Sequence, residues 1–264
     1  MLKLNHISVT FNEGTPDEKR ALNDIQLELN KGEFVTVIGS NGAGKSTLMN
    51  IISGALLPDV GDVFIGGKQV VHFPEYKRST YIGRVFQDPM AGTAPSMTIE
   101  ENLSMAYSRD KKRKLRLGVT KQRKELFRDY LTTLNLGLED RLNAKVGLLS
   151  GGERQALSLL MSTFTEPNIL LLDEHTAALD PSRAELITSL TDKVVREFGL
   201  TTLMVTHNMQ QALDLGSRLI MMDKGQIIFD VNGEEKQKLA IEALLHEFRR
   251  IRGMQFGDDR AVLS

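Results

Sequence analysis

The chain opens with two stretches in which apolar and polar residues alternate, as they do in strands with one face in water. The alternation covers residues 2–11 and 21–30, and a polar segment typical of a turn or loop separates them. Residues 34–39 form a short apolar run that ends in glycine, which is typical of a buried parallel strand. Helical spacing then runs over residues 46–54, and short strands are predicted within residues 61–70 and 81–87.

The pattern changes over residues 88–164, where strand signals disappear. Helical periodicity predicts three helices, at residues 99–110, 121–137 and 151–164. We interpret this region as an inserted helical subdomain. The basic run at residues 111–114 is interpreted as a solvated connection rather than a binding patch.

Strands and helices alternate again in the last third of the chain. Strands are predicted at residues 168–173, 201–207, 218–223 and 225–230, and helices at residues 183–199 and 209–216. This order is typical of a parallel sheet covered by helices on both faces, and thus of an α/β fold. The final helical pattern puts Leu244, Leu245, Phe248 and Ile251 on one face, which is expected to pack on the parent domain.

Composition narrows the classes of function. The 264 residues, 41 % hydrophobic and 25 % charged, fit a folded protein of one or two domains. The net charge of −1 argues against a nucleic-acid partner. The absence of cysteine excludes disulfides and thiolate chemistry. No apolar run approaches the roughly 20 residues of a membrane span, so any membrane role is expected to come through a partner.

The strongest chemical signal is the segment GSNGAGKST, between the strand at residues 34–39 and the helix that follows. It fits the phosphate-binding pattern G-x-x-x-x-G-K-[ST], in which glycines let backbone N–H groups converge on phosphate oxygens. We expect Lys45 to reach the β- and γ-phosphates and Ser46 to bind Mg²⁺. The nucleotide-binding residues of this P-loop are Gly39, Ser40, Asn41, Gly42, Ala43, Gly44, Lys45, Ser46 and Thr47.

Two carboxylates lie where the buried strand at residues 168–173 ends. Ligands of parallel sheets bind beyond the carboxyl ends of the strands, so Asp173 and Glu174 are expected to face the phosphates. Asp173 is suited to hold Mg²⁺, directly or through water. Glu174 is placed to polarise the attacking water, which is worth roughly 10²–10⁴-fold in rate. Without other motifs, an acidic pair at a strand end is an ordinary loop start as often as a catalytic site. The P-loop upstream favours the catalytic interpretation.

Two further polar residues lie at predicted strand ends. His207 lies at the end of the strand predicted at residues 201–207 and is expected to contact the γ-phosphate, although a lone histidine is usually structural. Gln87 closes the strand at residues 81–87 and is placed to sense Mg²⁺ or the attacking water. A second glycine turn, Ser150-Gly151-Gly152, precedes a helix; it suits an anion site, and helix capping explains it equally well.

These motifs occur in the order and spacing of the ATP-binding cassette (ABC) ATPases. GSNGAGKST, Gln87, LLSGGERQ, ILLLDEHTAALD and His207 all match, and the resemblance covers roughly residues 1–230. It implies a P-loop NTPase (RecA-like) parallel sheet, an antiparallel β subdomain and a helical subdomain at about residues 88–164, with residues 231–264 as a C-terminal helical tail.

The resemblance also implies roles for residues that the patterns leave open. Residues 149–153 would be the family signature, so that Ser150, Gly151, Gly152 and Glu153 contact ATP held by a second subunit packed head to tail. Residues 178–180 would link the two sites. Phe11 would stack on adenine, whereas from the residues alone it is an aromatic at a strand end that favours the core.

One position departs from the family pattern. His175 follows Glu174 where the family most often has proline. Histidine titrates near neutral pH and is placed to tune the base; the alternative is a loop substitution without catalytic consequence. The sequence is also similar to a subgroup of bacterial uptake ATPases associated with amino-acid-type solutes.

The single cassette favours the energising ATPase of a transporter. About 63 positions separate Gln87 from Ser150, too few for the long coiled coil of chromosome-maintenance ATPases. We expect a homodimer on the cytoplasmic face of the membrane, bound to permease subunits and served by an extracytoplasmic solute-binding protein. Import is favoured; an exporter ATPase and a soluble ATP-driven switch are the alternatives.

The permease is expected to contact residues 88–106 of this chain. Met90, Met97 and Met105 lie within that segment and are adaptable contact residues. Core packing is an equally good interpretation of each.

Overall fold

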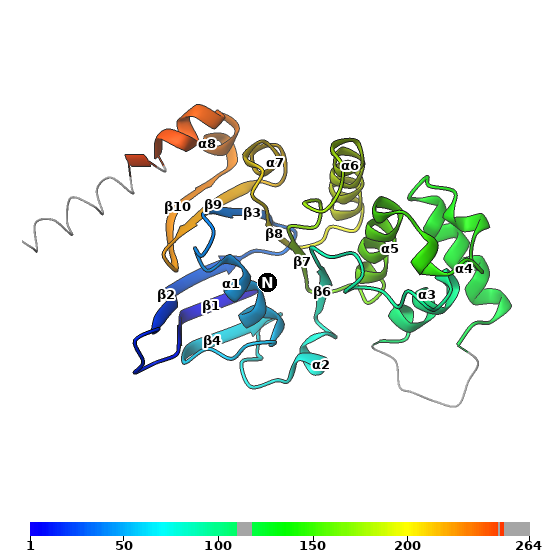
Figure 1. The fold of residues 1–264 in the computed structure, drawn as a ribbon, viewed down its shortest axis with the longest axis horizontal. Coiled ribbons are helices and arrows are strands. Elements are labelled where there is room, and N and C mark those ends of the chain that lie inside the picture. Colours follow the sequence, from blue (N-terminus) through cyan, green and yellow to red (C-terminus); the bar gives the residue numbers. More distant parts are fainter. Residues whose placement is uncertain (110–117, 248, 251–264) are drawn as a thin grey trace, which may run out of the picture.

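The computed structural model describes residues 1–109, 118–247 and 249–250 and contains two sheets beside a group of helices (Figure 1). The first sheet is antiparallel, in the order β2-β1-β4-β5. Its strands are β1 (Leu2–Phe11), β2 (Lys19–Leu29), β4 (Val60–Ile65) and β5 (Lys68–Gln69). The alternation in β1 buries Leu2, Leu4, Ile7 and Val9, so the predicted half-exposed strands are confirmed.

The second sheet has six strands in the order β10-β9-β3-β8-β7-β6. Its neighbours are parallel except for the antiparallel pair β9 and β10. The strands are β3 (Phe34–Gly39), β6 (Ile82–Val85), β7 (Ile169–Asp173), β8 (Thr202–Val205), β9 (Arg218–Asp223) and β10 (Gln226–Asn232). The carboxyl ends of β3, β7 and β8 therefore meet at one edge, where the candidate residues lie. The predicted α/β fold is confirmed.

Helices cover both faces of the parallel sheet. Ile169 and Leu171 of β7 pack in the cluster that contains α1 (Lys45–Ser53) and the antiparallel sheet. Leu170 and Leu172 point to the opposite face and pack with α6 (Pro181–Glu197). Continuous apolar runs are what strands covered on both faces require.

A short helix that the patterns do not predict, α2 (Glu75–Arg78), precedes β6. Its Arg78 is fully buried and donates hydrogen bonds to the carbonyl oxygens of Ile51 (2.6 Å) and Phe73 (3.1 Å). Burial lowers the pKa of this guanidinium. Arg78 thereby joins the end of α1 to the chain entering β6.

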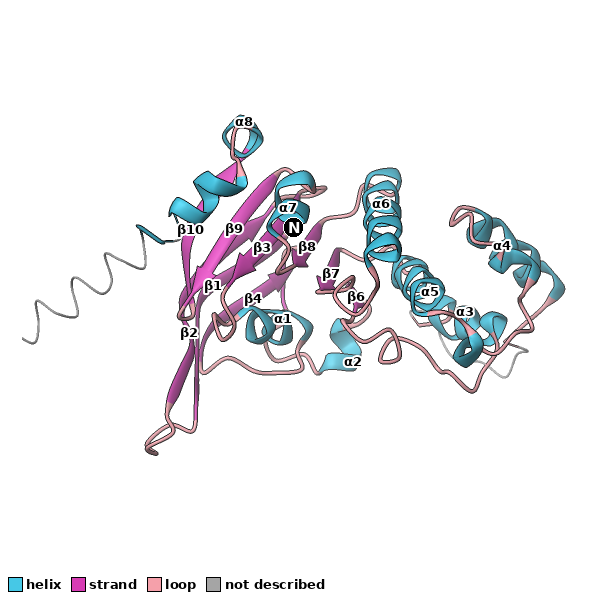
Figure 2. Ribbon diagram, turned by 45° about the horizontal axis from the view of Figure 1, so that its top comes forward, coloured by secondary structure: helices cyan, strands magenta, loops and turns pink. Residues whose placement is uncertain are grey.

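Helices without strands occupy the described residues between β6 and β7. They are α3 (Ile99–Tyr107), α4 (Lys121–Thr132), α5 (Gly151–Thr163) and the 3₁₀ turns Leu138–Asp140 and Val146–Leu148. They share a core that includes Leu103, Phe127 and Leu157, and they lie beside the β6 edge of the sheet (Figure 2). Residues 111–114 lie outside the described part of the chain.

The chain ends with α7 (Met209–Asp214), α8 (Gly233–Gln237) and a helical segment at residues 241–247. Leu244 is buried against Ile38 and Leu219 of the sheet, whereas Phe248 and Ile251 lie outside the described residues. Among the described helices, none combines the length and apolar character needed to cross a bilayer.

Candidate active site

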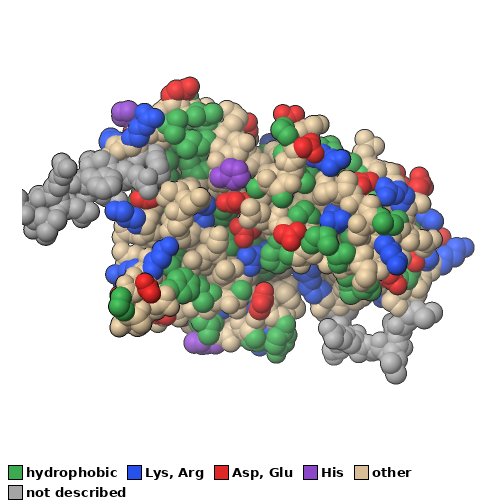
Figure 3. Space-filling model, viewed as in Figure 1, with side chains coloured by type: hydrophobic (Ala, Val, Ile, Leu, Met, Phe, Trp, Pro, Cys, Tyr) green, Lys and Arg blue, Asp and Glu red, His purple; other side chains and the backbone are tan. Residues whose placement is uncertain are grey.

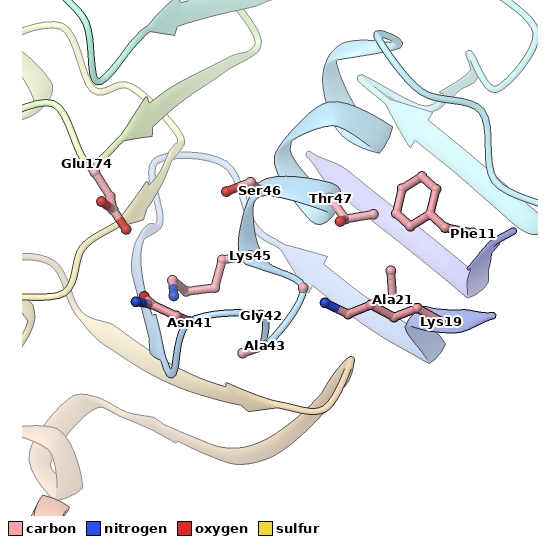
Figure 4. Close-up of a pocket in the computed structure, with 11 residues that line it drawn as sticks. Phe11, Lys19, Ala21, Asn41, Gly42, Ala43, Lys45, Ser46, Thr47 and Glu174 are labelled. Atoms are coloured by element: carbon pink, nitrogen blue, oxygen red, sulfur yellow. The ribbon is translucent and has the colours of Figure 1, made fainter. Parts of the chain in front are cut away.

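A pocket of about 210 Å³ lies over the P-loop at the carboxyl end of β3 (Figure 4). Phe11 and the β2 residues Lys19 and Ala21 form one side, and Glu174 faces the loop from the other. The remaining lining residues are Asn41, Gly42, Ala43, Gly44, Lys45, Ser46 and Thr47. Phe11 is 40 % exposed, so the core interpretation of this residue is wrong.

Glycine is required where the P-loop enters α1. Gly44 has φ +99°, and a Cβ there would lie 2.5 Å from the carbonyl oxygen of Ala21. A side chain would therefore force the loop away from β2. Since the first N–H groups of a helix have no intrahelical partner, this loop leaves a backbone cradle at the start of α1 that fits phosphate.

Lys45 is 7 % exposed and extends back along its own loop. Its ammonium donates hydrogen bonds to the carbonyl oxygens of Gly39 (2.8 Å) and Ser40 (3.1 Å). Burial lowers the pKa of Lys45, opposed by the negative charges of Glu174 and Asp173. A cation that is hydrogen-bonded to two carbonyl oxygens and lies in the field of two carboxylates suits contact with a polyphosphate.

Glu174 and His207 come from two neighbouring loops, which we call the β7 loop (residues 174–180) and the β8 loop (residues 206–208). Oε2 of Glu174 lies 3.5 Å from Nδ1 of His207. Glu174 has φ +44°, and its backbone N–H donates to the carbonyl oxygen of Val205 (2.9 Å). Acidic side chains and a histidine lie together at the centre of the face in Figure 3. The left-handed backbone is costly outside glycine, and the neighbouring strand end holds it.

Asp173 lies at the carboxyl end of β7, where Arg84 of β6 binds it. The distance from Nη2 of Arg84 to Oδ2 of Asp173 is 3.1 Å, and the guanidinium also donates to Asn50 and Ser53 of α1. Sequence patterns did not identify Arg84, although a charge inside an apolar strand was an available signal. The carboxylate of Asp173 and the hydroxyl of Ser46 are the hard oxygen donors that Mg²⁺ prefers, so the residues fit that ion.

Gln87 lies beyond the end of β6, whereas the pattern predicts it within the strand. Strand β6 ends at Val85, two residues earlier, and Gln87 is exposed in the following bend. It does not line the P-loop pocket. The expectation that Gln87 closes its strand is therefore wrong, because residues after Val85 no longer pair with β7.

The second glycine turn forms the start of α5, as predicted. Ser150 and Glu153 form a capping box: Glu153 N–H donates to the Ser150 hydroxyl (3.3 Å), and Ser150 N–H to the Glu153 carboxylate (2.7 Å). Burial favours a raised pKa for Glu153, but hydrogen bonds from Ser150 and Arg141 outweigh it and lower that pKa. A Cβ on Gly151 would lie 3.3 Å from Leu179. Gly151 thus lies beside the β7 loop, and residues 150–153 do not line the P-loop pocket of their own chain.

Residues 22–177 match the sequence model of the family described as "ABC transporter". This match covers more than half of the chain and contains the P-loop, the capped turn at Ser150 and the carboxylates at the end of β7. The chain belongs to the ABC transporter family. It is an ATP-binding cassette with ATPase activity.

Relatives of known name match nearly the whole cassette. A "Tyrosine transport ATP-binding protein" from Clostridioides difficile is 44 % identical over 248 residues, 94 % of this chain and 98 % of the relative. The xylose/arabinose import ATP-binding protein of Sulfolobus acidocaldarius is 36 % identical, over 87 % and 89 %. Both are named as transport ATP-binding proteins.

Solved structures support the same assignment. A dimeric bacterial ABC transporter cassette superposes with a TM-score of 0.74 at 30 % identity, over 88 % of this chain and 98 % of that one. A dimeric post-hydrolysis cassette bound to ADP and Pi gives a TM-score of 0.74 at 29 % identity, with the same coverage. The predicted ABC ATPase architecture is therefore confirmed.

His175, which departs from the family pattern, is buried in this ABC cassette. The imidazole is 2 % exposed, and its Nε2 lies 2.9 Å from the hydroxyl of Thr191 on α6. Because Thr191 donates its proton to Ile187 (2.8 Å), Nε2 is assigned as the donor to Thr191. Burial lowers the pKa of His175 from 6.5 to about 4. The ring is therefore neutral near pH 7, which argues against tuning of the base by its titration there.

This depressed pKa predicts a loss of stability in acid. Above pH 6.5 the ring is neutral in both folded and unfolded chains; below it, protonation favours the unfolded chain until about pH 4. Between pH 7.5 and 5, this group should remove about 2 kcal/mol from the free energy of unfolding. Urea unfolding of the wild type and His175→Gln at both pH values measures the difference, and equal pH dependence would refute it.

Proposed function

We propose that this chain is the ATP-hydrolysing subunit of a bacterial importer, working as a head-to-tail dimer that binds two ATP. One observation carries the proposal: the P-loop pocket and the capped turn at residues 150–153 do not line one pocket within a chain. Twofold pairing would place the Ser150 turn of one subunit over the P-loop of the other. Hydrolysis would then remove the contact that joins them.

Within each site, the residues divide the chemistry among them. Phe11 would stack on adenine, and the P-loop with Lys45 would bind the phosphates. Glu174 would accept the proton of the attacking water, and His207 would contact the γ-phosphate. Ser46, Asp173 and Gln87 would hold Mg²⁺, directly or through water. Mg²⁺, when bound, neutralises charge that develops on the phosphates.

We infer an amino-acid-type solute for the transporter. The 44 % identity with a relative named for tyrosine transport extends over 94 % of this chain and supports that class. Permease subunits would select the solute, together with an extracytoplasmic solute-binding protein. The cassette would lie on the cytoplasmic face of the membrane. In this division of the chain, residues 1–230 form the ATPase, residues 88–164 its helical subdomain, and residues 231–264 a C-terminal tail.

The permease would bind through residues 88–106. Met90, in the turn after β6, is 42 % exposed, and Met105, on α3, is 47 % exposed, which supports contact rather than core packing for both. Met97 is half-buried. Flexible thioether side chains suit a surface that receives a partner helix.

The docking proposal predicts that Met105→Glu releases the permease without affecting ATP hydrolysis. A buried carboxylate in that contact would be left unpaired, so co-purification with a multi-span permease should fall at least about ten-fold. Leu57→Glu is the matched control, because Leu57 is 58 % exposed outside residues 88–106. If both variants still co-purified with the permease, this docking surface would be excluded. If the wild type co-purified with no membrane protein, the transport proposal would be contradicted.

A further inference from the structure

Behind Glu174 and His207, one side-chain amide connects both of their loops to α6. Gln211, in the first turn of α7, is 9 % exposed. Its Oε1 accepts a hydrogen bond from the hydroxyl of Thr206 (2.8 Å) in the β8 loop. Its Nε2 donates to the hydroxyls of Thr188 on α6 (2.7 Å) and Thr176 in the β7 loop (3.3 Å). All hydrogen-bonding groups of this amide are therefore used.

The surrounding hydroxyls fix the orientation of the amide. Thr206 accepts from the backbone N–H of Asn208 (3.1 Å), so its own proton is available for Oε1 of Gln211. Thr188 donates its proton to the carbonyl oxygen of Ala184 (2.7 Å) and accepts from Nε2. A flipped amide would place Oε1 against Thr188, whose only proton is already used. The network thus has one arrangement.

The main chain of Gln211 is held as well. Its N–H donates to the side-chain oxygen of Asn208 (3.0 Å), which caps α7. Thr206 directly precedes His207, and Thr176 is two residues after Glu174. A fixed Gln211 therefore sets the separation of the loops that carry the Glu174 and His207 side chains, 3.5 Å apart.

We propose that Gln211 is a positioning residue, which holds the β7 and β8 loops at the separation that hydrolysis needs. The inference rests on the proposed roles of Glu174 and His207 at the γ-phosphate. Misplacement of reacting groups by about 1 Å costs up to roughly 10²-fold in rate. Gln211 itself does not line the P-loop pocket, so nucleotide affinity should not depend on it.

The test is Gln211→Met, which keeps the side-chain length and removes every amide hydrogen bond. We expect kcat for ATP hydrolysis to fall about ten-fold, with the Kd for ATP unchanged within two-fold. Gln210→Met is the matched control: Gln210 is its neighbour on α7, and its exposed amide donates only to Asp214 (2.7 Å) among the described contacts. That variant should retain wild-type kcat.

A double-mutant cycle separates positioning from general loosening of the fold. In a His207→Ala background, Gln211→Met should lower kcat by a smaller factor than in the wild type, because only Glu174 and no imidazole remains to be placed. Thr206→Val removes the hydroxyl that donates to Oε1 of Gln211, at nearly constant side-chain volume. This variant should lower kcat by a similar factor. It replaces Gln211→Met in the test if Gln211→Met does not fold. Equal losses with and without His207, or unchanged kcat in both variants, would overturn the inference. Wild-type kcat in His207→Ala and Glu174→Gln would instead refute the proposed site.

Discussion

Glu174→Gln should lower the rate of ATP hydrolysis by roughly 10²–10⁴-fold while ATP still binds. Glutamine keeps the size of the side chain and its reach towards His207, 3.5 Å away, but the amide does not accept the proton of the attacking water. Because the product is not formed, ATP should remain between the subunits and trap the dimer. Single-turnover hydrolysis and gel filtration with ATP measure the two effects.

The control for backbone strain is Glu166→Gln. Glu166 also has a left-handed backbone, φ +45° against +44° for Glu174, but it precedes β7 and does not line the P-loop pocket. The Glu166→Gln variant should hydrolyse ATP at the wild-type rate. If Glu174→Gln did the same, Glu174 would not be the base.

Most of the fold was predictable because most of its strands and helices have a local pattern in the sequence. Buried strands such as β3 and β7 are apolar runs bounded by a glycine or a charge, and α6 is long enough for its periodicity to be read. Helix α2 spans four residues, less than two turns, so no periodicity marks it. Arg78 of α2 donates a hydrogen bond to the carbonyl oxygen of Ile51, more than 20 positions earlier in the chain. No local pattern in the sequence contains this contact.

The residues of the candidate site are also of two kinds: a local motif marks some of them, and only the fold brings the others together. The P-loop residues are contiguous, so the sequence pattern identifies them. Lys19 and Arg84 belong to strands that only the folded sheets bring to the P-loop and Asp173. Gln211 resembles its neighbour Gln210 in the sequence, and only the contacts distinguish them: three threonine hydroxyls for one, a surface aspartate for the other.

Lys45→Ala and Ser150→Arg should separate ATP binding from hydrolysis. Lys45 is the buried cation of the P-loop, and losing its charge-assisted contacts with the phosphates should weaken ATP binding by the monomer at least about 100-fold. Ser150 lies outside that pocket. Ser150→Arg should change the monomer's Kd less than two-fold, yet a bulky cation between subunits should lower hydrolysis by the dimer about 100-fold. Isothermal titration and steady-state ATPase assays measure both.

Loss of the helix cap alone does not account for such an effect. The Ser150 cap is worth about 1 kcal/mol, and Thr120→Arg removes a comparable cap, from α4, far from residues 150–153 in the chain. Thr120→Arg should therefore retain hydrolysis. If Ser150→Arg instead weakened monomer binding as much as Lys45→Ala, both motifs would serve one pocket within a chain. A selective loss of hydrolysis requires that the Ser150 turn act on ATP held by another molecule.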